Sequence, residues 1–401
     1  MNTATIPRPA HVPSELVRDF DFRDFPGHET DVHLAWKALH EGPDLFWSPR
    51  HGGYWVATRA DDIDAMQADH ERFSYRHITV PIQADFPPLA PLEYDPPSHG
   101  PLRAILSPAF GPKPVQSLEA DLRQLSLDLL SQFEHVGHCD FVDAYAKRLP
   151  IVMFLRLVDL PLEDREELLT LTELSVRPKT EADRQQAFMG LQQYIGRWIV
   201  ERKTRPGKDL LSRMVNAEIG DRPISELELA GMIPNVIFGG LDTVASALSF
   251  TARALAETPS LRRQLIEDPS LIPAAVEEFL RRFGIPNTAR VITHDMDYRG
   301  VQLRQGEQVL LSKALHGLDE RRFADPLNID FHRPRQPNAA FGEGPHRCPG
   351  APLARMEMRV FLEQWLQHIP DFHITPGETV RTSSGPVNGM LYLPLSWTAK
   401  S

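Results

Sequence analysis

The chain has 401 residues, of which 42% are hydrophobic, so it can bury a large core. Its 43 basic and 54 acidic residues give a formal net charge of −11, which argues against nucleic acid as a partner. With two cysteines and no signal-peptide core at the N-terminus, it does not resemble a disulfide-rich secreted scaffold, and a reducing, cytoplasmic compartment is expected.

The chain shows no sign of a membrane segment or of a division into domains. No apolar run reaches the roughly 18 residues needed to span a bilayer, so we expect no membrane anchor. No shift in composition marks a linker, and a single domain is expected over residues 1–401. The prolines at positions 7, 9 and 13 predict a largely irregular segment over residues 1–20.

In chain order, the first clear elements are a short strand over residues 53–58 and a helix that begins near residue 61. Apolar residues then recur at helical spacing in three segments, residues 115–135, 163–175 and 183–203.

A long helix is predicted next. Ser225 followed by Glu228 forms a capping-box pattern, and the helix should run from there to about Glu257. At that length it would span about 45 Å, the width of a whole domain. Pro234 removes one of its backbone hydrogen bonds and is expected to kink it.

The last third of the chain predicts two helices separated by strands. One helix starts over residues 270–273 and ends near Phe283 and Gly284. Residues 290–312 alternate, with glycines between them, and predict short strands. Another helix follows Cys348. The predicted class is therefore mainly α-helical with a minor β-sheet.

The most informative segment is residues 341–350, here called the cysteine loop. It reads Phe-Gly-Glu-Gly-Pro-His-Arg-Cys-Pro-Gly and leads straight into a helical pattern. Glycines let a backbone pass close to a flat ligand, and a helix N-terminus lowers the pKa of a nearby thiol. A lone cysteine is more often a buried structural residue, and Cys139, which lacks such a setting, is assigned that role.

The cysteine loop resembles the haem-binding loop of the cytochromes P450. The resemblance implies that Cys348 is the thiolate ligand of the iron in haem b, held between a long central helix and the cysteine-loop helix. Pro349 departs from the aliphatic residue more usual after the ligand, which affects hydrogen bonding at the sulfur. The positions that match the motif and contact the cofactor are Phe341, Gly344, His346, Cys348 and Gly350.

Two adjacent glycines, Gly239 and Gly240, lie inside the predicted long helix, where each costs about 1 kcal/mol relative to alanine. Close packing against another helix is one explanation. The segment also resembles the oxygen-binding segment of the camphor-hydroxylating P450 group. That resemblance implies a groove for dioxygen beside Gly239, with Thr243 and Asp242 as the catalytic residues that deliver protons.

Glu278 and Arg281 are three residues apart and therefore share one helix face. By themselves they could form a surface ion pair of little consequence. The spacing resembles the Glu-x-x-Arg signature of the same family, which implies that the pair is buried and bonds Arg333. We expect a structural role for the three residues, here called the Glu278 set.

Four cationic residues match positions that bind the haem propionates in the family: His99, Arg103, Arg290 and His346. Any one of them alone could be a solvated surface cation. Arg103 and Arg355 also match the face near the cysteine where a ferredoxin docks in relatives. The chain has no flavin or nicotinamide fingerprint, so the expected electron donor is a [2Fe–2S] ferredoxin with its ferredoxin reductase.

The resemblance also bears on the substrate. Where the camphor-hydroxylating relatives have a tyrosine that bonds the ketone, this chain has Pro87 and Pro88, which lack any donor. The pocket is therefore expected to be apolar, with Asn235 as the one polar group facing it from the long helix. A small hydrophobic substrate is implied, a cyclic terpenoid or norisoprenoid rather than camphor. The matching pocket positions are Asn235, Phe238, Pro286 and Val387.

The resemblance covers nearly the whole chain and implies a monooxygenase that inserts one atom of O₂ into a C–H bond. Two other functions stay open. A peroxide-driven haem-thiolate peroxygenase would not need the Asp242–Thr243 pair. A non-catalytic haem-binding sensor would be expected to carry a regulatory domain, which the sequence does not contain.

Overall fold

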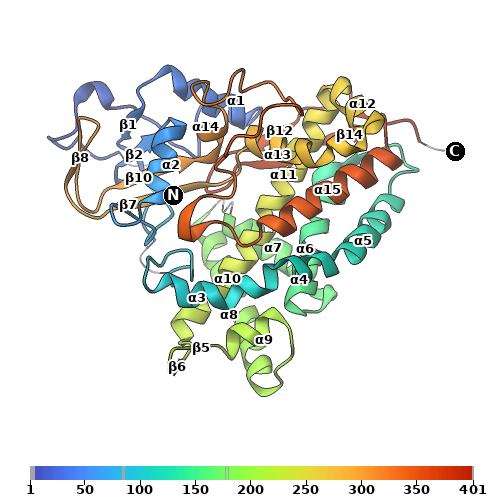
Figure 1. Ribbon diagram of the computed structural model, residues 1–401, viewed down its shortest axis with the longest axis horizontal. Coiled ribbons are helices and arrows are strands. Elements are labelled where there is room, and N and C mark those ends of the chain that lie inside the picture. The colour runs from blue at the N-terminus through green and yellow to red at the C-terminus, as the bar shows by residue number, and fades with distance from the viewer. Residues whose placement is uncertain (1–4, 84–85, 177, 179, 400–401) are drawn as a thin grey trace.

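The computed structural model describes residues 5–83, 86–176, 178 and 180–399, and it is mainly helical with small β-sheets, as the sequence predicts. Strands β1, β2, β7, β8 and β10 lie on the left of the molecule in Figure 1, and helices α4, α5, α6 and α15 lie on the right. The helices are α1 (Val32–Lys37), α2 (Ala60–Ala68), α3 (His99–Leu106), α4 (Pro112–Ser117), α5 (Glu119–Ser131), α6 (Arg148–Val158), α7 (Arg165–Val176), α8 (Glu181–Thr204), α9 (Leu210–Val215), α10 (Glu226–Gly240), α11 (Asp242–Glu257), α12 (Pro259–Glu267), α13 (Ile272–Arg282), α14 (Lys313–Gly317) and α15 (Ala351–His368).

The largest sheet has five strands in the order β1-β2-β10-β7-β3. Strand β10 runs parallel to β2 and antiparallel to β7. All five residues of β10 are buried, as expected of a strand covered on both faces. The strands of this sheet are β1 (Leu45–Ser48), β2 (Tyr54–Ala57), β3 (Phe73–Ser74), β7 (Asn287–Ile292) and β10 (Gln308–Ser312).

The remaining strands form small sheets of two or three strands. Strands β11, β14 and β4 make one of them, and the others are the pairs β12–β13, β5–β6 and β8–β9. Their bounds are β4 (His138–Asp140), β5 (Glu218–Ile219), β6 (Arg222–Pro223), β8 (Met296–Tyr298), β9 (Val301–Leu303), β11 (His373–Ile374), β12 (Arg381–Ser383), β13 (Gly389–Tyr392) and β14 (Pro394–Ser396).

The predicted long helix starts where the capping box places it, but it is interrupted. The Ser225 hydroxyl accepts a hydrogen bond from the Glu228 backbone at 3.2 Å, and the Glu228 carboxylate accepts one from the Ser225 backbone at 2.8 Å. Leu241, with φ −97° and ψ −69°, then separates α10 from α11. Two poor helix formers precede the break, and the Thr243 hydroxyl donates to the Gly239 carbonyl, which weakens the regular ladder there.

Close helix packing does not explain the two glycines. A Cβ built on Gly239 or Gly240 would meet no atom within 4 Å, so both border open space. The close approach lies further upstream, where a Cβ on Gly231 would come within 1.9 Å of the Pro88 carbonyl oxygen. Gly231 therefore lets the loop before α3 lie directly on α10.

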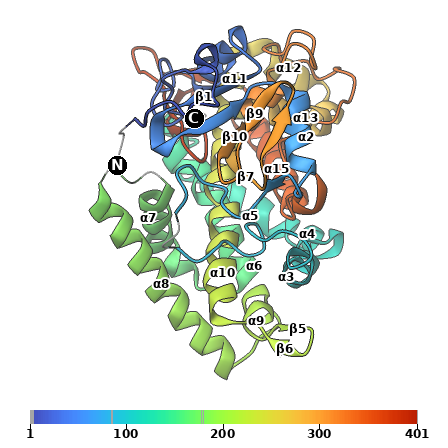
Figure 2. The same ribbon diagram turned by 90° about the vertical axis from the view of Figure 1, so that its left-hand side faces the viewer.

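The segment Glu226–Glu257 is long and apolar enough to cross a bilayer by length and composition. No uninterrupted apolar run within this segment reaches the required length, which is why the sequence predicted no membrane segment. In the structure, 61% of the most apolar stretch of this segment is buried inside the protein, so α10 and α11 pack in the core. Figure 2 shows α10 running through the middle of the molecule, with α8 along the outside.

Candidate active site

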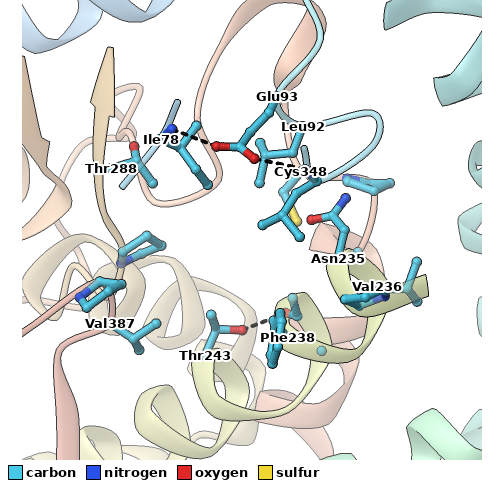
Figure 3. A pocket seen from close by; sticks show the side chains of 18 of the residues that line it. Ile78, Leu92, Glu93, Asn235, Val236, Phe238, Thr243, Thr288, Cys348 and Val387 are labelled. Atoms are coloured by element: carbon cyan, nitrogen blue, oxygen red, sulfur yellow. Dashed lines mark hydrogen bonds between the residues drawn. The ribbon is translucent and has the colours of Figure 1, made fainter. Parts of the chain in front are cut away.

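A cavity of about 990 Å³ lies between α10 and α11 on one side and the cysteine loop on the other. Cys348, Thr243 and Val387 all line it, each from a different element (Figure 3). The structure thus brings Thr243 together with Cys348 and Val387, which lie more than 100 positions later in the chain.

The cysteine loop is shaped by its glycines. Gly342 and Gly344 have φ angles of 69° and 65°, in the left-handed region that favours glycine. The Cys348 backbone N–H donates to the Phe341 carbonyl at 2.8 Å, which closes the loop. Helix α15 begins at Ala351, so the cysteine lies just before a helix N-terminus, as the sequence predicts.

The Cys348 thiol is exposed, but only to the cavity deep inside the protein. Burial raises the pKa of this thiol, while the Gly350 and Ala351 backbone N–H groups and the Arg103 guanidinium oppose the rise. The helix start thus lowers the thiol pKa, as the sequence predicts, but burial has the larger effect in the protein chain by itself. Loss of hydration outweighs the helix N-terminus.

His99, Arg290 and His346 form a basic wall of the cavity. The rings of His99 and His346 lie 4.2 Å apart. Arg290 lies 3.5 Å from the centre of the Tyr75 ring and His346 stacks on that ring at 3.6 Å, so they must cover its opposite faces. Arg103, one turn after His99 on α3, also lines the cavity and donates to the Arg347 carbonyl of the cysteine loop.

Several nitrogens of the basic wall have no hydrogen-bond partner, although Arg290 Nη1 donates to the Ala289 carbonyl at 2.6 Å. Across the described part of the chain, Arg290 Nε, His99 Nε2 and both ring nitrogens of His346 are buried without a hydrogen-bond partner. Burial lowers the pKa of all three side chains. Neighbouring cations lower the pKa of His99 and His346 further, whereas Tyr75 and Asp95 oppose the lowering at Arg290. Buried donors of this kind need acceptors, which an anionic ligand could supply.

The opposite wall is built by α10 and α11. Phe238, Gly239 and Thr243 line it, and the Thr243 hydroxyl donates to the Gly239 carbonyl at 2.8 Å (Figure 3). Asp242 begins α11 beside Thr243 but does not itself line the cavity. Of the two residues predicted to deliver protons, Thr243 is the one that reaches the cavity.

Asn235 lies two turns before Thr243 and also lines the cavity. Its side-chain nitrogen donates to the Ala90 carbonyl at 3.1 Å. Because a carbonyl can only accept, this contact fixes which end of the amide is nitrogen. The amide oxygen is left without a partner among the described residues and is available to a donor in the cavity.

Loops also contribute to the lining of the cavity. Pro286 and Val387 form an isolated antiparallel bridge, and both line the cavity, as do Pro87 and Pro88. The Glu93 carboxylate accepts from the Ile78 backbone at 2.9 Å and the Leu89 backbone at 2.8 Å, tying two loops together (Figure 3). Burial raises the pKa of Glu93.

The Glu278 set lies outside this cavity. The Glu278 carboxylate accepts from Arg281 at 2.7 and 2.8 Å and from Arg333 at 3.0 Å. Arg281 also donates to the carbonyls of Gly317 at 2.7 Å and Pro326 at 2.8 Å. A Cβ on Gly317 would lie 1.9 Å from the Arg281 carbonyl oxygen, so the two segments are in close contact.

Arg355, predicted on the same face as Arg103, packs over the Phe341 ring at 4.5 Å and pairs with Glu277 at 3.0 Å. It is partly exposed. Arg103 and Arg355 thus reach the two ends of the cysteine loop.

Sequence reasoning missed several residues of the cavity lining. Glu357 lies four residues after Leu353 and four before Phe361, so the apolar spacing of α15 could have placed it on the inward face. No local signal pointed to the others, since their burial depends on distant segments. The missed residues are Gln67, Tyr75, Lys313 and Glu357.

Comparison with known proteins agrees on one family. The sequence profile described as Cytochrome P450 matches residues 167–396. The chain is 34% identical to a probable cytochrome P450 127A1 of Sinorhizobium fredii, over 98% of this chain and 97% of that protein. It is 32% identical to a mycinamicin IV hydroxylase/epoxidase of Micromonospora griseorubida, over 86% of this chain and 89% of that protein.

Solved structures give the same result. The structure of CYP101C1 superposes with a TM-score of 0.90 at 38% sequence identity, and that of CYP101J2 with a TM-score of 0.89 at 37%. In both cases the match covers 98% of this chain and all of the other.

Proposed function

This chain belongs to the cytochrome P450 family, and we propose that it is a ferredoxin-dependent monooxygenase that hydroxylates a small hydrophobic substrate. Members of the family are haem-thiolate monooxygenases that bind haem b. The observation that carries the proposal is the shared cavity, which is lined by Cys348 at a helix start, by a basic wall and by Thr243 opposite. We further propose one P450 domain over residues 1–401 and a cytoplasmic location.

The residues of the cavity fit haem b. The cofactor brings two carboxylates, and the basic wall holds buried donors that lack acceptors. Its iron would be held by a protein ligand, and Cys348 lines the cavity. We assign Cys348 as that ligand. Iron would deprotonate the thiol outright, and this offsets the raised pKa of Cys348 in the chain alone.

Other cavity residues complete the cofactor site. We assign His99, Arg103, Arg290 and His346 to the propionates, and Phe341, Gly350 and Gly239 to contacts with the cofactor or the oxygen beside it. A Cβ on Gly350 would lie 3.8 Å from the Cys348 sulfur, so this glycine keeps the space around the sulfur open.

Proton delivery is assigned to Thr243 and Asp242. Bound haem would supply oxygen activation, and the chain must bring protons to the cavity for it. The Thr243 hydroxyl donates its hydrogen to the Gly239 carbonyl. Its oxygen can therefore accept a hydrogen bond from a donor such as water. Asp242 precedes Thr243 at the start of α11. We assign it as the acid that would supply new protons from outside the cavity.

Electrons are proposed to come from a [2Fe–2S] ferredoxin with its reductase. Arg103 and Arg355 lie at the cysteine loop, where a docked donor would be nearest to the ligand. The positive charges of these two arginines would attract an acidic ferredoxin.

The substrate is proposed to be a cyclic terpenoid or norisoprenoid. The lining near Thr243 is largely apolar, with Phe238, Pro286 and Val387. The free amide oxygen of Asn235 supports a further point: a substrate that carries a hydroxyl would be oriented by donating to it.

The test is turnover with a [2Fe–2S] ferredoxin, its reductase, NADH and ¹⁸O₂ on a panel of cyclic monoterpenes and ionones. We expect a hydroxylated product that carries one ¹⁸O atom and depends on ferredoxin. Product formed only with hydrogen peroxide would identify a peroxygenase instead. Haem binding with no product under either condition would favour a sensor.

A further inference from the structure

Lys313 is a buried lysine on the cavity wall that sequence reasoning did not identify. It is the first residue of α14, directly after β10, and is only 6% exposed. Its backbone N–H donates to the Pro286 carbonyl at 3.1 Å. A Cβ on Gly284 would come within 2.1 Å of the Lys313 backbone, so the segment is held in place by close contact.

The ammonium of Lys313 has a neutral partner. It donates to the side-chain oxygen of Gln67, whose nitrogen in turn donates to the Ile63 carbonyl at 3.1 Å. Nowhere in the described part of the chain does a carboxylate lie within ion-pair distance of Lys313. The nearby acid Asp64 is already paired with Arg322 at 3.0 Å.

The pair of Lys313 and Gln67 lies beside the cysteine loop and the basic wall. A Cβ on Gly342 would lie 3.6 Å from the Gln67 oxygen, and His346 is in the same loop. Arg290 is close enough that its charge lowers the pKa of Lys313, which burial brings to about 7. The charges of Asp64 and Glu343 act in the opposite direction but do not offset these effects.

This side of the cavity therefore holds two buried cations, Lys313 and Arg290, with no anion in contact. Burying a charge is costly unless it is paired. An anion bound in the cavity would pair with both groups and would also accept hydrogen bonds from the orphaned Nε of Arg290 and from a ring N–H of His346.

We propose that Lys313 is a further cationic ligand of a haem carboxylate, acting beside Arg290 and His346. The inference rests on the proposed function, because it takes haem as the ligand. It adds a residue to the four cations identified from the sequence, and it gives the unpaired buried ammonium a counterion.

The experiment compares wild type with Lys313→Met, which keeps an unbranched side chain one atom shorter and removes its charge. The rate at which each holoenzyme loses haem to excess apomyoglobin is measured. We expect loss from Lys313→Met to be at least about tenfold faster, the effect of roughly 1.4 kcal/mol of lost binding. Lys313→Arg, which retains the charge, should fall closer to wild type.

Two controls separate charge pairing from packing. Lys37→Met removes a surface lysine that pairs with Glu320, and haem loss should not change. In proteins reconstituted with haem dimethyl ester, whose carboxylates are blocked, wild type and Lys313→Met should release the cofactor at the same rate. The ferric–ferrous potential of Lys313→Met should also be lower, because a positive charge near the iron is gone.

Equal haem loss from wild type and Lys313→Met would overturn the inference. So would an equal acceleration with the dimethyl ester, which would show that Lys313 acts by packing. A Lys313→Met protein that purifies without haem but takes up the dimethyl ester as wild type does would support it. The proposed function fails separately, if wild type itself shows no thiolate-ligated carbon monoxide spectrum.

Discussion

The hydroxyl of Thr243 donates to the carbonyl of Gly239 at 2.8 Å, across Leu241, which separates α10 from α11. This bond places a polar oxygen at the edge of the cavity, opposite Cys348. Gly239 contributes no side chain there, so space remains beside the hydroxyl.

Replacing Thr243 with alanine should leave haem and substrate binding intact and waste electrons. Without the hydroxyl, protons no longer arrive in order, and reduced oxygen escapes as hydrogen peroxide. The measurement is the ratio of product and of peroxide to NADH consumed. Thr243→Ser, which keeps the hydroxyl, serves as the control and should retain much of the coupling. Full coupling in the alanine variant would remove Thr243 from proton delivery.

Replacing Asp242 with asparagine should slow turnover strongly, by a factor of about 10² or more for a lost proton-transfer group. Its size is kept, so the fold and the haem spectrum should not change. The check is the rate of NADH oxidation with saturating substrate and ferredoxin, measured in H₂O and D₂O. An unchanged rate and isotope effect would contradict the role assigned to Asp242.

Three of the motifs recognised in the sequence are local, and this is why their positions could be predicted. The capping box of Ser225 and Glu228, the glycines around Cys348 and the spacing of Glu278 and Arg281 each depend on a few neighbouring residues. The mainly helical class with a minor sheet followed from the same kind of pattern, and it is confirmed.

Other features of the fold and of the cavity depend on contacts between distant segments and could not be predicted from the sequence. The sequence predicts that a threonine such as Thr243 can bond back to a carbonyl and bend the helix, but it does not predict that the helix is interrupted at Leu241. Lys313 is a polar residue whose burial is decided by packing around the cavity. The raised pKa of the Cys348 thiol likewise reflects depth in the folded chain rather than the adjacent helix start.

Removing Glu278 should strongly destabilise the fold. Its carboxylate is 5% exposed and pairs with Arg281 and Arg333, so Glu278→Gln leaves two cations short of a counter-charge. Breaking a buried ion set in this way costs about 3–5 kcal/mol in free energy of unfolding. The check is urea denaturation. The control is Glu257→Gln, whose carboxylate is 44% exposed and whose partner Arg253 keeps its pairing with Asp31, with an expected cost below about 1 kcal/mol. Similar losses in both variants would argue against a special role for the Glu278 set.

Glu357 makes the stability of the protein depend on pH. Burial raises the pKa of this carboxyl to about 8, so the folded protein keeps it protonated where the unfolded chain has released the proton. Between the unfolded value near 4.5 and about 8, wild type therefore loses stability as pH rises. Glu357→Gln lacks this titration, so its free energy of unfolding relative to wild type should increase from pH 5 to pH 8 by a few kcal/mol. A difference that stays constant over this range would show that Glu357 titrates normally.

The most direct test of the central claim is the spectrum of the reduced, carbon monoxide-bound protein. We predict the red-shifted Soret band of a thiolate-ligated haem in wild type, and its loss in Cys348→His, with Cys139→Ser as the matched control that keeps the band. A thiolate spectrum that survives in Cys348→His, or its absence from wild type, would contradict the assignment of Cys348 as the haem ligand.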